Sequence, residues 1–107
     1  MKRSEFLKFL GLMRRAGMLS VSEEGTGQAA RAGKARLILV ASDASANAVH
    51  RADGFAHRAQ VPMYRLCVSK AELADALGTA GSAMAAVCDA GFARALLEKF
   101  PDEMDRI

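Results

Sequence analysis

Hydrophobic residues recur at helical spacing in five segments of the chain and run almost consecutively in four shorter ones. Apolar residues at every third or fourth position indicate one face of a helix, and short apolar runs indicate buried strands. The predicted helices cover residues 5–16, 23–32, 43–58, 70–77 and 90–100, and the predicted strands cover 18–21, 36–41, 61–68 and 83–88. Strands that alternate with helices predict an α/β fold, a three-layer α/β/α sandwich with a mostly buried central sheet.

The segment from Arg31 to Ser45, RAGKARLILVASDAS, contains a helix end, a strand and the start of the next helix. Gly33 is a typical helix stop. Residues 37–40 form the uninterrupted apolar run that a strand covered on both faces needs. Ser42 or Asp43 can cap the helix that follows. The segment therefore predicts a helix–strand–helix unit whose strand is buried.

Other helix ends carry residues that match the rules of helix capping. Ser22 can cap the second helix, and Asp89 can cap the last one. Ser69 and Glu72, in the order SKAE, form a capping box for the fourth helix. Pro101 stops the last helix, so we expect the polar tail, residues 101–107, to be frayed.

Composition indicates one domain, residues 1–107, with a modest core, because 51% of the 107 residues are apolar and 25% are charged. The net charge of +3 is unevenly distributed. Residues 1–36 hold eight basic and three acidic residues, whereas the remainder holds seven basic and nine acidic ones. A basic N-terminal third is typical of a solvated face or of a surface for a polyanion. Only 6% of the residues are aromatic, which argues against a base-stacking platform.

Several functional classes find no support in the sequence. Cys67 and Cys88 are too few for a disulfide framework, so we expect buried free thiols in a reducing cytoplasm. His50 and His57 lie seven residues apart, which is about 10 Å along a helix and too far to share a zinc ion. No nucleophile motif, phosphate loop, signal peptide or membrane-spanning run stands out. We therefore expect a cytoplasmic protein that is not an enzyme and has no cofactor, metal or membrane partner.

The remaining candidate for a binding site combines the start of the second helix, Lys34 and the loop 78–82. Ligands of α/β proteins favour loops at strand ends, and helix N-termini attract anions. Glu23 and Glu24 occupy this N-terminus and would repel a phosphate. Their carboxylates can instead accept hydrogen bonds from the edges of guanine or cytosine.

Five stretches of the chain, taken in order, resemble a known family. They read LGLMRRAGMLSVSEE (10–24), ARAGKARLILVASDAS (30–45), VPMYRL (61–66), SKAELADALG (69–78) and AAVCDAGFARALLEKF (85–100). The chain resembles the kink-turn RNA-binding superfamily of ribosomal proteins, in its small bacterial YlxQ-like branch. The resemblance covers residues 6–100 and implies a single α/β/α domain with a four-stranded mixed sheet and a role in RNA binding associated with translation.

The resemblance also implies which residues bind RNA. In the superfamily, RNA is held by a Gly-x-Asn-Glu element at the start of the second helix, a lysine one turn later and the loop before the last strand. By position, the element falls on Ser22, Glu23, Glu24 and Gly25, the lysine on Gln28, and the loop on Gly78, Thr79, Ala80, Gly81 and Ser82. Lys34 matches directly, and phosphate contacts are expected from Arg14, Arg15, Arg31, Lys34 and Arg36.

Three positions depart from the family's pattern: Glu24 stands for the asparagine, Gly25 for the glutamate and Gln28 for the lysine. We therefore expect binding of structured, kink-turn-like RNA near the ribosome, more by shape and backbone contact than by sequence. The alternative is a protein-interaction module on the same fold. Such a module would have lost specific RNA recognition, and would bind itself or a translation or transcription protein through its Ala- and Met-rich surfaces. Salt distinguishes the two, because phosphate contacts weaken steeply as salt rises.

Overall fold

The computed structural model describes residues 2–79 and 82–107. Its helices are α1 (Lys2–Arg15), α2 (Ser22–Arg31), α3 (Ala46–Ala59), α4 (Lys70–Leu77) and α5 (Ala90–Lys99), followed by the short 3-10 helix η1 (Pro101–Glu103). Its strands are β1 (Leu19–Val21), β2 (Leu37–Val40), β3 (Met63–Leu66), β4 (Met84–Val87) and β5 (Met104–Arg106). The five long helices and four of the strands correspond to the predicted elements, with bounds that differ by a few residues.

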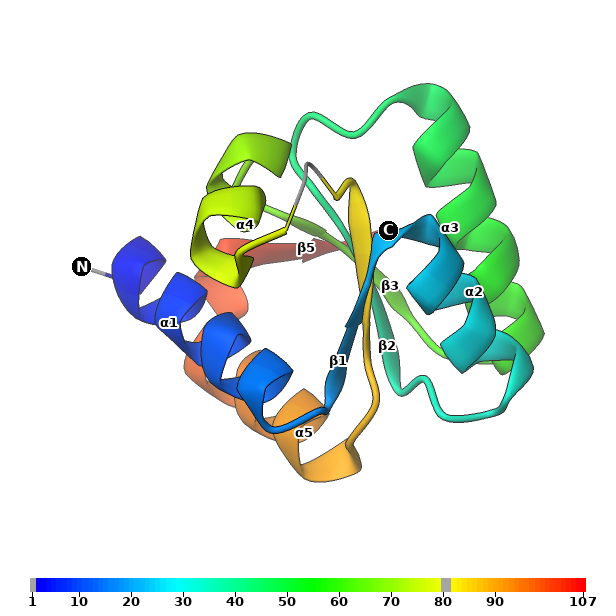
Figure 1. Ribbon diagram of the computed structural model, residues 1–107, viewed down its shortest axis with the longest axis horizontal. Coiled ribbons are helices and arrows are strands. Elements are labelled where there is room, and N and C mark those ends of the chain that lie inside the picture. Colours follow the sequence, from blue (N-terminus) through cyan, green and yellow to red (C-terminus); the bar gives the residue numbers. More distant parts are fainter. Residues whose placement is uncertain (1, 80–81) are drawn as a thin grey trace.

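The strands form one mixed sheet in the order β1-β4-β2-β3-β5, in which only β2 and β3 run parallel. Helices cover both faces of this sheet: α1, α4 and α5 lie on one side, and α2 and α3 lie on the other (Figure 1). The α/β prediction is therefore confirmed, but the predicted number of four strands is wrong because a fifth strand lies at the edge beside β3.

The apolar run of β2 is buried on both faces, as the sequence predicted. Leu37 and Leu39 point into the core beneath α1, α4 and α5, whereas Ile38 and Val40 point into the core beneath α2 and α3. Successive side chains of a strand point to opposite faces, so a strand between two helical layers needs an apolar residue at every position.

The tail is ordered, so the prediction of a frayed segment at residues 101–107 is wrong. β5 pairs antiparallel with β3, with Leu66 opposite Met104, and the Met104 side chain is only 6% exposed. The backbone N–H of Ile107 also donates to the carbonyl of Met63 at 2.9 Å. The sequence of the tail is polar because two of the three strand residues are exposed, and its order comes from pairing with β3.

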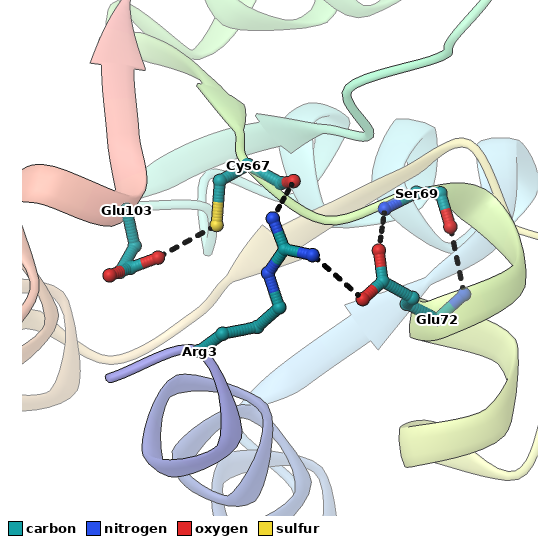
Figure 2. A network of polar contacts seen from close by, with 5 residues as sticks. All are labelled: Arg3, Cys67, Ser69, Glu72 and Glu103. Atoms are coloured by element: carbon teal, nitrogen blue, oxygen red, sulfur yellow. Dashed lines mark hydrogen bonds and ion pairs between the residues drawn. The ribbon is translucent and has the colours of Figure 1, made fainter. Parts of the chain in front are cut away.

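A polar network ties the tail to the rest of the molecule (Figure 2). Arg3, from α1, donates to the carbonyl of Cys67 at 3.2 Å and to Glu72 at 3.3 Å. The Cys67 thiol donates to Glu103 at 2.8 Å, and burial together with this carboxylate raises the pKa of that thiol. The capping box of Ser69 and Glu72 is present as predicted, and the Ser69 N–H lowers the pKa of Glu72.

The start of α3 differs from the prediction. Ser45, rather than Ser42 or Asp43, caps this helix, and its hydroxyl accepts from the Ala48 N–H at 3.1 Å. The Asp43 carboxylate instead accepts from the N–H of Lys70 at 2.9 Å, at the start of α4. Within the described part of the chain, no helix has the length and hydropathy needed to cross a lipid bilayer.

Candidate nucleic-acid interface

The chain passes from β1 into α2 without an intervening loop. Ser22 makes this junction in the left-handed region, with φ of 74°, which a residue with a side chain rarely adopts. Its hydroxyl accepts a hydrogen bond from the Gly25 N–H at 3.2 Å. The N-cap position of α2 is therefore Val21 and not Ser22 as predicted, although the Ser22 hydroxyl still satisfies one N–H of the first turn.

A hydrogen bond joins this junction to the segment before β4. The backbone N–H of Ser22 donates to the Ser82 hydroxyl at 2.9 Å, and that hydroxyl donates to the carbonyl of Met84 at 2.6 Å. Ser82 is only 6% exposed, so both bonds are shielded from water. The two elements that the family resemblance predicts to bind RNA are thus in direct contact, although they lie 60 residues apart in the sequence.

The rest of the predicted loop begins at the end of α4. Gly78 ends that helix in the left-handed conformation, with φ of 66°, as glycine typically does at this position. Thr79 follows and is half-buried. Ala80 and Gly81, which were also predicted to contact RNA, lie outside the described residues.

Three predicted RNA-binding residues line one groove of about 270 Å³ beside α2. They are Gly25, Gln28 and Lys34, and Ser20 of β1 and Cys88 line the same groove. Ser20 and Cys88 were not predicted as site residues, because only the pairing of β1 with β4 brings them beside α2. Gln28 and Lys34 are exposed, so their polar groups are accessible to a ligand.

The two acidic residues at the start of α2 have different surroundings. Glu23 pairs with Arg51 of α3 at 3.1 Å, and both side chains are about half exposed. Glu24 is exposed and makes no ion pair or hydrogen bond to another residue that the structure describes. Arg51 was missed by the sequence analysis because the contact depends on the packing of α2 against α3. Of the two carboxylates, that of Glu24 would contact a base edge without first breaking the pair with Arg51.

Three predicted phosphate-binding cations surround the other end of α2. Arg31 lies in its last turn, Lys34 follows in the next loop, and Arg36 donates to the carbonyl of Gly33 at 3.4 Å. All three side chains are exposed. A helix of 10 residues is about 15 Å long, so these cations lie roughly that far from the carboxylates at its start.

The two remaining predicted cations belong to α1, on the opposite face of the sheet from α2 (Figure 1). Arg14 donates to the carbonyl of Leu77 at 3.0 Å, which places it next to the loop that begins at Gly78. Arg15 lines a different groove, between α1 and α5. The structure therefore brings Arg14 to the loop but does not bring Arg15 to the cations of α2.

No three His, Cys, Asp or Glu side chains gather closely enough to hold a metal ion within residues 2–79 and 82–107. His57 lies 3.6 Å from Asp53, one turn earlier on α3. Cys67 and Cys88 are free and half-buried rather than fully buried.

The fold of this chain is shared with other solved structures. The Giardia lamblia 15.5kD RNA binding protein superposes with a TM-score of 0.73 over 95% of this chain and 87% of that one, at 17% sequence identity. A Bacillus halodurans protein of unknown function superposes with a TM-score of 0.78 over 90% of this chain and 96% of that one, at 28% identity. No protein-family model and no curated protein sequence matches the chain.

Proposed function

We propose that this protein binds structured RNA of the kink-turn type, as a member of the YlxQ-like branch, and acts in the cytoplasm near the ribosome. It works by binding and not by catalysis. The observation that carries the proposal is the hydrogen bond from Ser22 to Ser82, which joins the start of α2 to the segment before β4. The fold shared with an RNA-binding protein supports it.

The chemistry of the interface divides between its two ends. The exposed carboxylate of Glu24 accepts hydrogen bonds, and the N1 and N2 groups of a guanine donate them in a matching pair. Arg31, Lys34 and Arg36 supply positive charge to phosphates at the other end of α2. Base contact at one end and backbone contact at the other would hold a bent RNA in one orientation.

The first test compares a kink-turn RNA with a plain duplex of equal length, at about 50 and 200 mM salt, because phosphate contacts respond strongly over that range. We expect selective binding of the kink-turn RNA at both salt concentrations. Equal weak binding of the two RNAs that disappears at the higher salt would contradict the proposal. That result would favour the protein-interaction module instead.

A gain-of-function variant sharpens this test. Gln28→Lys restores the lysine of the family pattern beside Lys34, and should tighten binding of the kink-turn RNA while steepening its salt dependence by about one phosphate contact. Asp102→Asn changes the net charge equally but lies on exposed η1, so it is the matched control. Equal gains from both variants would mean that net charge alone, rather than this groove, governs binding.

A loss-of-function pair tests the cations. Lys34→Ala should weaken RNA binding, whereas Arg94→Ala, which removes an exposed cation from α5, should leave the affinity unchanged. Unchanged affinity of the Lys34 variant would place the phosphate contacts elsewhere.

A further inference from the structure

A second groove, of about 740 Å³, is lined by residues of α1 and of the C-terminal end of α5. These two helices lie on the face of the sheet away from α2 (Figure 1). Its apolar lining consists of Phe9, Leu12 and Phe100. Leu12 is 46% exposed, and it lies beside Phe9, which is only partly buried, so the apolar surface here is a cluster and not a single side chain. The two helices meet through aromatic rings, with centroids 5.8 Å apart for Phe9 and Phe92.

Charged side chains surround this apolar lining, and the cations outnumber the acids. The cations are Lys2, Lys8, Arg15 and Lys99, and the acids are Glu5 and Glu98. The ammonium group of Lys2 lies 5.9 Å from the centre of the Phe100 ring, and that of Lys99 lies 5.6 Å from the centre of the Phe9 ring. The basic character of the N-terminal third of the sequence is therefore concentrated partly here, away from the RNA interface.

We propose that this groove docks one amphipathic helix of a partner protein, whose apolar stripe is flanked by carboxylates. A helix that lies in a groove places side chains from successive turns into it, so Leu12 and the edges of Phe9 and Phe100 would receive the apolar stripe. The carboxylates would pair with the cations around the groove, which supply orientation and speed of association.

The same features disfavour RNA as the occupant. Bases stack on the open faces of aromatic rings, but lysine ammonium groups already lie over the rings of Phe9 and Phe100. The apolar lining also distinguishes the two occupants, because the RNA backbone has no apolar groups to bury against Leu12, whereas an amphipathic helix has. Because α1 and α5 lie on the opposite face of the sheet from α2 (Figure 1), the protein can bind the RNA and the partner helix at the same time.

The test uses the full chain and three fluorescent helical peptides of about 18 residues, long enough for a groove-binding helix. The first carries Leu and Phe at positions i, i+3, i+4 and i+7, flanked by Glu. The second replaces every Glu with Lys, and the third replaces the apolar stripe with Ser. We expect only the first to bind, by anisotropy at low salt, with amide shifts in α1 and α5. Leu12→Glu and Lys99→Glu should each weaken it about tenfold or more.

Arg58 is an exposed residue of α3, and Arg58→Glu makes the same charge change as Lys99→Glu. It is the control variant, and we expect it to leave peptide binding intact. Equal binding of the three peptides, absence of binding, or amide shifts in α2 would each overturn the proposal. A dimer in sedimentation that Leu12→Glu dissociates would make a second copy of the chain the occupant. Loss of kink-turn RNA binding in Leu12→Glu would make the groove an RNA surface. The proposed function fails separately, through the RNA measurements on Gln28 and Lys34.

Discussion

Replacement of Ser82 by alanine is the most direct perturbation of the candidate interface. The Ser82 hydroxyl accepts from the Ser22 N–H at 2.9 Å and donates to the Met84 carbonyl at 2.6 Å. Ser82→Ala removes both bonds and adds no bulk. It therefore separates the start of α2 from the segment before β4 without changing charge.

The expected loss of stability follows from the burial of that hydroxyl. Ser82 is only 6% exposed, so water does not replace the lost partners at full strength. A net hydrogen bond contributes about 0.5–1.5 kcal/mol, and a buried group left without a partner adds to the penalty, so we expect about 2 kcal/mol in total. Ser22 also has an unfavourable φ of 74°, and the variant removes the hydrogen bond from Ser82 that stabilises this conformation.

The assay combines denaturant unfolding with binding of the kink-turn RNA. A matched control is Ser45→Ala, which removes the cap of α3 at a cost of about 1 kcal/mol and leaves the Ser22–Ser82 bond in place. Both variants should be less stable than the parent chain, but only Ser82→Ala should bind the RNA more weakly. This contrast separates a local effect on the interface from a general loss of stability.

Two results would refute this reasoning. Unchanged stability of Ser82→Ala would mean that the hydroxyl does not join the two elements in solution. Reduced stability with unchanged RNA affinity would mean that the contact supports the fold but does not shape the RNA interface.

Three further predictions concern packing, charge and the tail. Gly25→Ala should stabilise the protein by about 0.5–1 kcal/mol, whereas Gly27→Ala should not, because its Cβ would lie 3.0 Å from the Phe55 ring. Denaturant unfolding measures both changes, and equal stabilisation by the two substitutions would contradict this packing. The pKa of Glu72 is lowered from its ordinary 4.5, so its ionised form stabilises the fold. Glu72→Gln should therefore unfold at a lower free energy than the parent chain at neutral pH. This difference in the free energy of unfolding should vanish as the pH is lowered through the pKa of Glu72 in the folded protein, and a difference independent of pH would exclude this carboxylate as its source. Met104→Ala should lower the free energy of unfolding by about 2 kcal/mol and make the tail more sensitive to proteases. If the tail were frayed, this substitution would change neither the stability nor the rate of proteolysis.

Most of the elements could be predicted because their signals are local. The continuous apolar run of Leu37–Val40 follows the helix stop at Gly33 and is short, so it predicts a strand between two helical layers, as observed. The capping box of Ser69 and Glu72 needs only the four residues SKAE. Both patterns depend on neighbours within one turn or one strand.

β5 could not be predicted, because its residues are mostly polar and its order depends on pairing with β3. The predicted cap of α3 was wrong for a related reason. Several polar residues precede that helix, and only the tertiary contact of Asp43 with the Lys70 N–H of α4 shows that Asp43 does not cap it. The candidate site shows the same division. The candidate RNA-binding positions follow from the family resemblance, but the contact between them does not follow from the sequence.

The sequence by itself thus determined the α/β class, most of the helices and strands, and the concentration of basic residues in the first third of the chain. Only the tertiary structure decided that Ser22 contacts Ser82, that Arg51 pairs with Glu23, and that the basic residues divide between two faces. The physical reason is distance along the chain. Helix periodicity and capping act over a few residues, whereas these contacts join residues that only the folding of the sheet brings together.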